Sequence, residues 1–184
     1  MTCCVGIEHA GGVVMGADSL AGSGDSYTTI RADEKLFRVD DLIIGFAGSW
    51  RAGQLLRYSF DPPERPENPD DIMRYLCSDF VDSVRACLSA GGMSATRESV
   101  EGMDDTSFLV AVEGKLYVVD SDFQVARSIS GYAAIGSGMP WAEGALHATQ
   151  KSKNHRARVI LALEAAAESC AWVRPPFNIL STKT

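Results

Sequence analysis

The sequence contains few histidines, no basic cluster and no long apolar stretch, and each lack excludes a class of function. Three scattered histidines among 184 residues argue against a zinc site and against a serine–histidine catalytic pair. A formal net charge of -7, without a run of Lys and Arg, argues against a protein that binds nucleic acid. No apolar stretch is long enough to span a membrane, and the first residues do not resemble a signal peptide. We therefore expect a cytoplasmic protein that binds neither nucleic acid nor membrane.

Cysteine is also scarce and odd in number, which is typical of reduced residues in a core. The five cysteines all lie within apolar patterns: Cys3, Cys4, Cys77, Cys87 and Cys170. Adjacent Cys3 and Cys4 would point to opposite faces of a strand and lack the spacing of a metal site. With 46% hydrophobic residues the chain can bury one core, so we expect a single domain over residues 1–184.

Apolar runs occur in pairs that short turns join, which is the pattern of β-hairpins. We predict hairpins within 1–18, 35–47 and 107–119, and further strands at 27–30, 125–129, 132–135 and 177–180. Helical periodicity predicts helices at 50–58, 72–88, 140–150 and 156–170. Small residues, prolines and glycines predict loops at 19–26, 61–69 and 90–105.

Strand pairs and helix pairs follow one another along the chain. This order predicts an α+β fold in which two antiparallel sheets lie between two helix pairs, a four-layer αββα sandwich. A parallel doubly wound sheet would need single strands that alternate with single helices, and the pattern lacks that alternation.

The beginning of the chain carries the strongest functional signal. Thr2 follows Met1, and threonine is small enough for the methionine to be removed. Thr2 would then carry a hydroxyl nucleophile and a free α-amine, so one residue would supply both nucleophile and base. The second strand of the predicted hairpin ends at Asp18, which places a carboxylate beside the start of the first strand.

These features, with further motifs in the same order, resemble the proteasome superfamily of N-terminal-nucleophile hydrolases. The matching segments run along the whole chain: Thr2 behind Met1, then 12–18, 34–37, 46–48, 135–140 and 162–167. The chain is most similar to the bacterial HslV peptidases, because Cys170 stands where other proteasome subunits usually have an aspartate. The resemblance implies the αββα N-terminal-nucleophile hydrolase fold.

The resemblance also implies a threonine endopeptidase that hydrolyses unfolded proteins or peptides through an acyl-enzyme ester. Thr2 would be the nucleophile, and its α-amine the general base. Lys35 would lower the pKa of the hydroxyl and of the amine, and Asp18 would orient Lys35. The backbone N–H of Gly48 would stabilise the oxyanion, and Ser137 would form a hydrogen bond near the amine.

Five positions of the chain match the substrate-binding residues of the family. They are Ala21, Gly22, Asp33, Phe46 and Trp50. Gly22 departs from the family, which usually has threonine there. The set implies a pocket with aromatic walls and one acidic residue.

No cofactor is implied as a requirement, but a structural Na+ or Mg2+ is implied on three backbone carbonyls. These carbonyls belong to Ala167, Cys170 and Val173, and the following segment 174–176 departs from the family sequence. The resemblance further implies a homo-oligomer, either a ring or stacked rings, and an ATP-dependent unfoldase as a partner.

The same residues also have interpretations that involve no catalysis. Asp18 is also typical of a turn, and Lys35 of a solvated strand. The alternative function is a catalytically silent, proteasome-like scaffold or assembly protein that keeps Met1.

Overall fold

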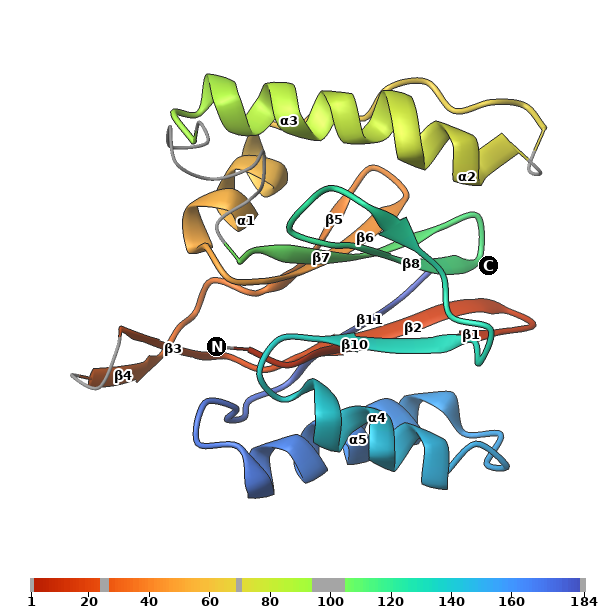
Figure 1. The fold of residues 1–184 in the computed structure, drawn as a ribbon. Coiled ribbons are helices and arrows are strands. Elements are labelled where there is room, and N and C mark those ends of the chain that lie inside the picture. Colours follow the sequence, from red (N-terminus) through yellow and green to blue (C-terminus); the bar gives the residue numbers. More distant parts are fainter. Residues whose placement is uncertain (1, 24–26, 69–70, 94–104, 183–184) are drawn as a thin grey trace.

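Two antiparallel sheets lie face to face between two layers of helices in the computed structural model (Figure 1). The structure describes residues 2–23, 27–68, 71–93 and 105–182. The four-stranded sheet has the order β10-β1-β2-β11. Its strands are β1 (Cys4–His9), β2 (Gly12–Ala17), β10 (Tyr132–Ile135) and β11 (Asn178–Ser181). The predicted α+β αββα sandwich is therefore confirmed.

The second sheet has five strands in the order β5-β6-β7-β8-β9. They are β5 (Leu36–Val39), β6 (Leu42–Ala47), β7 (Ser107–Val112), β8 (Lys115–Val119) and β9 (Val125–Ala126). Its outer face is covered by α1 (Trp50–Tyr58), α2 (Ile72–Tyr75), the π-helical η2 (Leu76–Phe80) and α3 (Val81–Ala90). The four-stranded sheet is covered by α4 (Met139–Ala148) and α5 (His155–Ser169) (Figure 1).

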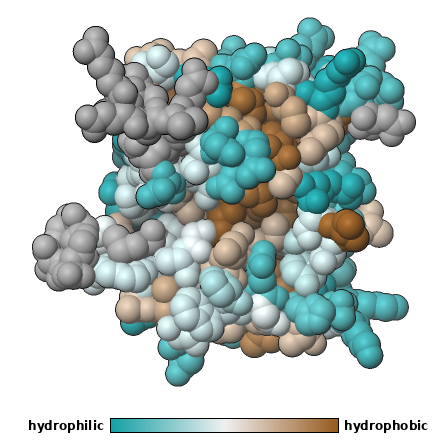
Figure 2. All heavy atoms as spheres, viewed as in Figure 1, coloured by the Kyte–Doolittle hydropathy of each residue, from teal (hydrophilic) through white to brown (hydrophobic). Residues whose placement is uncertain are grey.

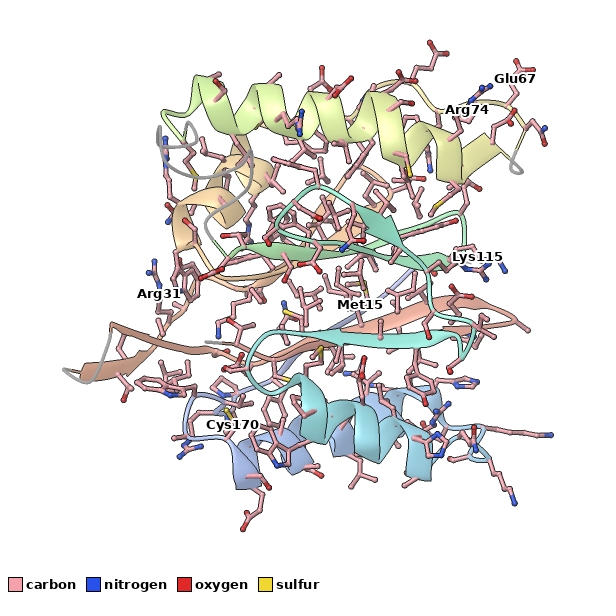
Figure 3. The ribbon with its side chains drawn as sticks, in the orientation of Figure 1. Met15, Arg31, Glu67, Arg74, Lys115 and Cys170 are labelled. Carbon is pink, nitrogen blue, oxygen red and sulfur yellow. The ribbon has the colours of Figure 1, made fainter. Side chains whose placement is uncertain are left out.

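Three apolar layers hold the sandwich together. One lies between the five-stranded sheet and its helices and includes Phe46, Leu76 and Phe108. A second lies between the other sheet and α4 and α5. The third fills the space between the sheets, where Figure 3 places Met15. Burial of these side chains is the main favourable contribution to folding, and it fixes the two sheets relative to each other.

The surface carries both hydrophilic and apolar residues. Figure 2 shows one face, on which apolar residues gather near the middle among hydrophilic residues that are spread over the face. Among the described residues, no helix combines the length and the apolar character that crossing a membrane requires.

The register of β1 explains how distant segments meet. Strand β1 pairs with β2 and with β10, so that Cys4 faces Ala17 on one side and Ile135 on the other. The chain segments just beyond these positions are Thr2, Asp18 and the loop that starts at Gly136. All three therefore lie at the same end of the four-stranded sheet.

Several predicted elements differ from the observed ones. Residues 20–23, predicted as loop, form β3 (Leu20–Ser23), which pairs with β4 (Tyr27–Ile30) in a separate two-stranded sheet. The predicted strand at 125–129 is reduced to β9. The predicted helix at 72–88 contains the π-helical segment η2, which the i+4 pattern does not distinguish from α-helix. Residues 94–104 of the predicted loop at 90–105, and 69 of the loop at 61–69, lie outside the described residues.

The cysteines form no disulfide in the structure, and not all of them are in the core. All five are free, and Cys3, Cys4 and Cys170 are buried. Cys77 is exposed, and Cys87 is half-buried at the helix layer. The apolar pattern around Cys77 therefore predicted its burial wrongly.

Candidate active site

Asp18 lies at the centre of a buried polar network, with only 1% of its surface exposed. Its Oδ1 accepts hydrogen bonds from the backbone N–H of Cys3 (3.0 Å) and from Lys35 Nζ (2.8 Å). Its Oδ2 accepts from the backbone N–H groups of Leu20 (3.0 Å) and Arg174 (3.3 Å). A carboxylate removed from water needs such partners, and here four donors hold it in one orientation.

Lys35 directly precedes β5, and its side chain is entirely buried. The residue lies beside β6, because its carbonyl accepts from Phe46 N at 3.1 Å. The ammonium group forms an ion pair with Asp18 at 2.8 Å and lies 5.7 Å from the centre of the Trp50 ring. Burial of an unpaired ammonium group would be strongly unfavourable in free energy. Lys35 can therefore be buried here only because it pairs with Asp18. Lys35 is therefore not a solvated strand residue.

Thr2 is buried and is enclosed by the loop that follows β10. Its backbone nitrogen donates to Ser137 Oγ at 3.2 Å, and its carbonyl accepts from Gly138 N at 3.0 Å. Gly136 has a φ of +89°, and a Cβ there would lie 2.4 Å from the Thr2 carbonyl oxygen. Only glycine permits this close approach.

Gly48 follows β6 and begins the turn into α1. Its φ is +116°, and a Cβ would lie 2.7 Å from the Cα of Thr106. Thr106 also accepts a hydrogen bond from Ser49 N at 2.9 Å, which fixes the turn. Among the described residues, no backbone carbonyl is recorded as an acceptor for the Gly48 N–H. The role of this donor at an oxyanion stays a prediction.

The loops of Gly48 and Thr2 lie next to each other. A Cβ on Gly136 would lie 3.1 Å from Ala47 Cβ, as well as against Thr2. The structure thus places the Asp18–Lys35 pair next to the Thr2–Ser137 contact, because Asp18 binds the backbone of Cys3, and it places the Gly48 turn nearby. Their catalytic roles remain predictions.

Replacement of Gly48 by Ala is expected to weaken both fold and turnover. The positive φ and the contact with the Thr106 backbone together cost about 2 kcal/mol, and relief of the strain would displace the N–H. Gly144→Ala in α4 is the matched control, because nothing lies within 4 Å of that Cβ. In a helix interior this change is expected to raise stability by about 0.5 kcal/mol. Thermal melts of both variants test the prediction, and equal melting temperatures would contradict it.

The predicted substrate-binding residues fall into two groups. Ala21 and Gly22 lie in β3, where Gly22 faces Thr28 across the ladder. Phe46 and Trp50 pack edge to face, with ring centroids 5.3 Å apart. Phe46 is buried in the core layer beneath the helices, and the partly buried Trp50 ring packs against it and lies 5.7 Å from Lys35 Nζ, so a substrate pocket with aromatic walls stays a prediction.

The predicted acidic residue of this pocket is not an isolated charge. Asp33 accepts two hydrogen bonds from the Arg31 guanidinium, one of them at 2.6 Å. These bonds hold the pKa of the Asp33 carboxyl below its usual value. Arg31 also stacks over Trp50, 4.1 Å from the ring centre. Asp33 therefore pairs with Arg31, a partner that the sequence interpretation did not foresee, and its place in a substrate pocket stays a prediction.

The three carbonyls predicted to hold Na+ or Mg2+ do converge, but on a side chain. Arg174 Nη1 donates to the carbonyls of Ala167 (3.1 Å), Cys170 (3.1 Å) and Val173 (2.7 Å). A metal ion does not fit among these oxygens while the positively charged guanidinium occupies them. Among the described residues, no group of His, Cys, Asp and Glu side chains is suited to a metal either.

The buried cysteines next to the site are poor nucleophiles. Burial raises the pKa of the Cys3 thiol, and raises that of Cys4 to about 12. Both therefore remain thiols at neutral pH, which argues against cysteine catalysis here.

The comparisons with known proteins concern the fold. Neither a protein-family model nor a curated protein matches the sequence. The structure is similar to BPH from Thiobacillus denitrificans, with a TM-score of 0.79, 22% identity and full coverage of both chains. Eukaryotic HslV from Trypanosoma brucei gives a TM-score of 0.70 and 18% identity, again over both complete chains. Anbu, an ancestral β-subunit from Yersinia bercovieri, gives 0.67 and 17%, over 97% of this chain and 80% of that chain. The chain therefore has the proteasome-like fold of HslV and Anbu, as its motifs predicted.

Proposed function

We propose that this protein is a threonine-type endopeptidase whose nucleophile, Thr2, is exposed by removal of Met1. One observation carries the proposal: the Asp18 carboxylate binds both the buried Lys35 ammonium and the backbone of Cys3, next to Thr2. A lysine buried for stability alone is an expensive choice, since an apolar pair of similar size packs equally well. A structure of the similar protein BPH is described as a complex with epoxomicin, so the same compound is a suitable probe for this chain.

The first half of the reaction forms an acyl-enzyme. With Met1 removed, the Thr2 nitrogen is an α-amine, whose ordinary pKa is about 7.7–8.0. The buried positive charge of Lys35 lowers that pKa, so that the amine is neutral at working pH and accepts the proton of its own hydroxyl. The Thr2 oxygen attacks the peptide carbonyl, and the Gly48 N–H stabilises the oxyanion.

The second half restores the enzyme. The protonated amine passes its proton to the nitrogen of the departing peptide, and the carbon–nitrogen bond breaks to leave a Thr2 ester. A water molecule, deprotonated by the same amine, then hydrolyses the ester. Ser137 Oγ lies 3.2 Å from the Thr2 nitrogen and orients it through both steps.

A peptidase without strong sequence preference needs enclosure, so the proposal includes a homo-oligomeric ring or barrel in the cytoplasm. A solved Anbu structure from Pseudomonas aeruginosa is described as a helical assembly. On this chain, Met139 and Trp141 of α4 and Met73 of α2 are each about 40% exposed and offer apolar contacts. An ATP-dependent unfoldase would supply unfolded chains to an enclosed site.

Mass spectrometry of the purified protein tests this function. We expect denatured protein to have lost one methionine, and incubation with epoxomicin to add one molecule of the compound at Thr2. The native mass is expected to be a multiple of the 19.7 kDa subunit, and fluorogenic peptides to be cleaved. Cys3→Ala is the matched control, because labelling should continue without the neighbouring thiol.

The alternative scaffold function makes the opposite prediction. A native protein that keeps Met1, takes up no epoxomicin and cleaves no peptide would refute the peptidase and favour the silent scaffold. A stable monomer would refute the enclosed assembly, since ring interfaces bury well over ~1,000 Å².

A further inference from the structure

The guanidinium of Arg174 occupies a position built for a cation. The residue follows α5, and its Nη1 atom donates to three backbone carbonyls at 2.7–3.1 Å. Two of these carbonyls belong to Cys170, which Figure 3 labels, and to Val173; the third belongs to Ala167, in the last turn of α5. One nitrogen that reaches three converging oxygens resembles the coordination of a small cation.

The end of α5 explains why a positive charge is needed there. The last carbonyls of a helix have no partners within the helix and carry partial negative charge. The Ala166 carbonyl accepts from Cys170 N at 2.8 Å and the Cys170 carbonyl from Val173 N at 3.2 Å, whereas the recorded donor to the Ala167 carbonyl is the Arg174 guanidinium. Either a metal ion or a cationic side chain can satisfy the converging oxygens, and this chain supplies the side chain.

The same residue is connected to the candidate active site. Arg174 N donates to Asp18 Oδ2 at 3.3 Å, and the Arg174 carbonyl accepts from Ser19 N at 3.1 Å. The backbone of Arg174 thus flanks the carboxylate on which Lys35 depends. Because the guanidinium and the backbone N–H belong to the same residue, the hydrogen bonds that hold the guanidinium also fix the position of the backbone beside Asp18.

We infer that Arg174 is a built-in replacement for a structural metal ion, which fixes the loop after α5 and thereby positions Asp18. The fold and stability of this protein are consequently independent of Na+, K+ and Mg2+. Removal of the guanidinium leaves three converging carbonyls and converts the protein into one that binds a cation there. Only the effect on turnover rests on the proposed function.

Thermal melts in buffers of equal ionic strength test this inference. The buffers contain tetramethylammonium, Na+ or Mg2+ chloride, with a chelator in the first. We expect the wild-type melting temperature to be the same in all three. Arg174→Ala is expected to melt about 4 °C lower in tetramethylammonium and to regain most of that loss, saturably, in Na+ or Mg2+. Arg156→Ala, an exposed charge on α5, is the matched control and should show neither change.

Chemical rescue distinguishes positioning from general stability. Where the protein cleaves peptides, Arg174→Ala is expected to lower kcat about tenfold with little change in KM. Dilute guanidinium, or the cation that restores the melt, is expected to restore kcat. The melts need no activity, so an inactive protein with the expected melts would refute the peptidase and leave the inference intact.

Three results would overturn the inference. The wild type could gain as much stability from Na+ or Mg2+ as Arg174→Ala does, which would mean that an ion binds beside the arginine. Arg174→Ala could melt lower without rescue by any cation, or melt like Arg156→Ala. If Arg174→Ala does not fold, Arg174→Lys takes its place, because its shorter ammonium should leave a smaller, still cation-sensitive loss.

Discussion

Peptide hydrolysis by Thr2→Ala is expected to fall by roughly 10³-fold or more, to the background of the assay. Alanine keeps the terminal amine and still permits removal of Met1, so only the nucleophilic hydroxyl is lost. Thr2→Ser is the matched variant, because serine keeps both hydroxyl and amine, and it should retain a substantial part of the rate. Initial rates on a fluorogenic peptide measure both.

The comparison requires that both variants fold and assemble as the wild type does. The backbone contacts of Thr2 with Ser137 and Gly138 do not involve the side chain being replaced, so both variants keep them. Melting temperature and native mass confirm this. Wild-type rates in Thr2→Ala would exclude Thr2 as the nucleophile, whatever the fold.

Local sequence signals predicted most of the fold. The predicted helix at 50–58 coincides with α1, and the hairpin at 107–119 with β7 and β8, because alternation and a Glu-Gly turn define it. Strand β3 escaped notice because it is only four residues long and contains a single large apolar residue, Leu20, so no alternation marks it; its pairing with β4 defines it. The strand propensity of such a segment is too weak to predict a strand.

The candidate site was predictable only in part. Thr2, Asp18 and Lys35 stand out through motifs whose order is typical of a family. The sequence did not reveal the role of Thr106. Its hydroxyl stabilises the turn at Ser49, which lies 57 positions away, and no local pattern predicts such a contact. Arg174 was visible only as a departure from the family, and its role depends on geometry at the end of α5.

Lys35→Met is expected to abolish hydrolysis and to lower the free energy of unfolding by about 3 kcal/mol. Both side chains of the Lys35–Asp18 pair are fully buried, so removal of the ammonium leaves a carboxylate with only backbone donors. Methionine fills a similar volume without charge. The loss corresponds to a fall of roughly 6 °C or more in melting temperature for a chain of this size. Activity should be absent even well below that temperature, where the variant is folded and assembled.

A double variant separates the structural role of the ion pair from its catalytic role. Asp18→Asn alone leaves a buried ammonium and turns an amide donor toward a backbone N–H, so it too is destabilised. In Asp18→Asn/Lys35→Met no unpaired charge remains, and the loss of stability should be about 2 kcal/mol smaller than the sum of the single losses. Peptide hydrolysis should stay absent in the double variant, because the cation that lowers the amine pKa is missing. If the double variant regained peptide hydrolysis together with stability, the role of Lys35 would be in folding alone. Because the amine of Lys35→Met keeps its proton to higher pH, a low rate of hydrolysis that is absent at neutral pH should appear only at higher pH.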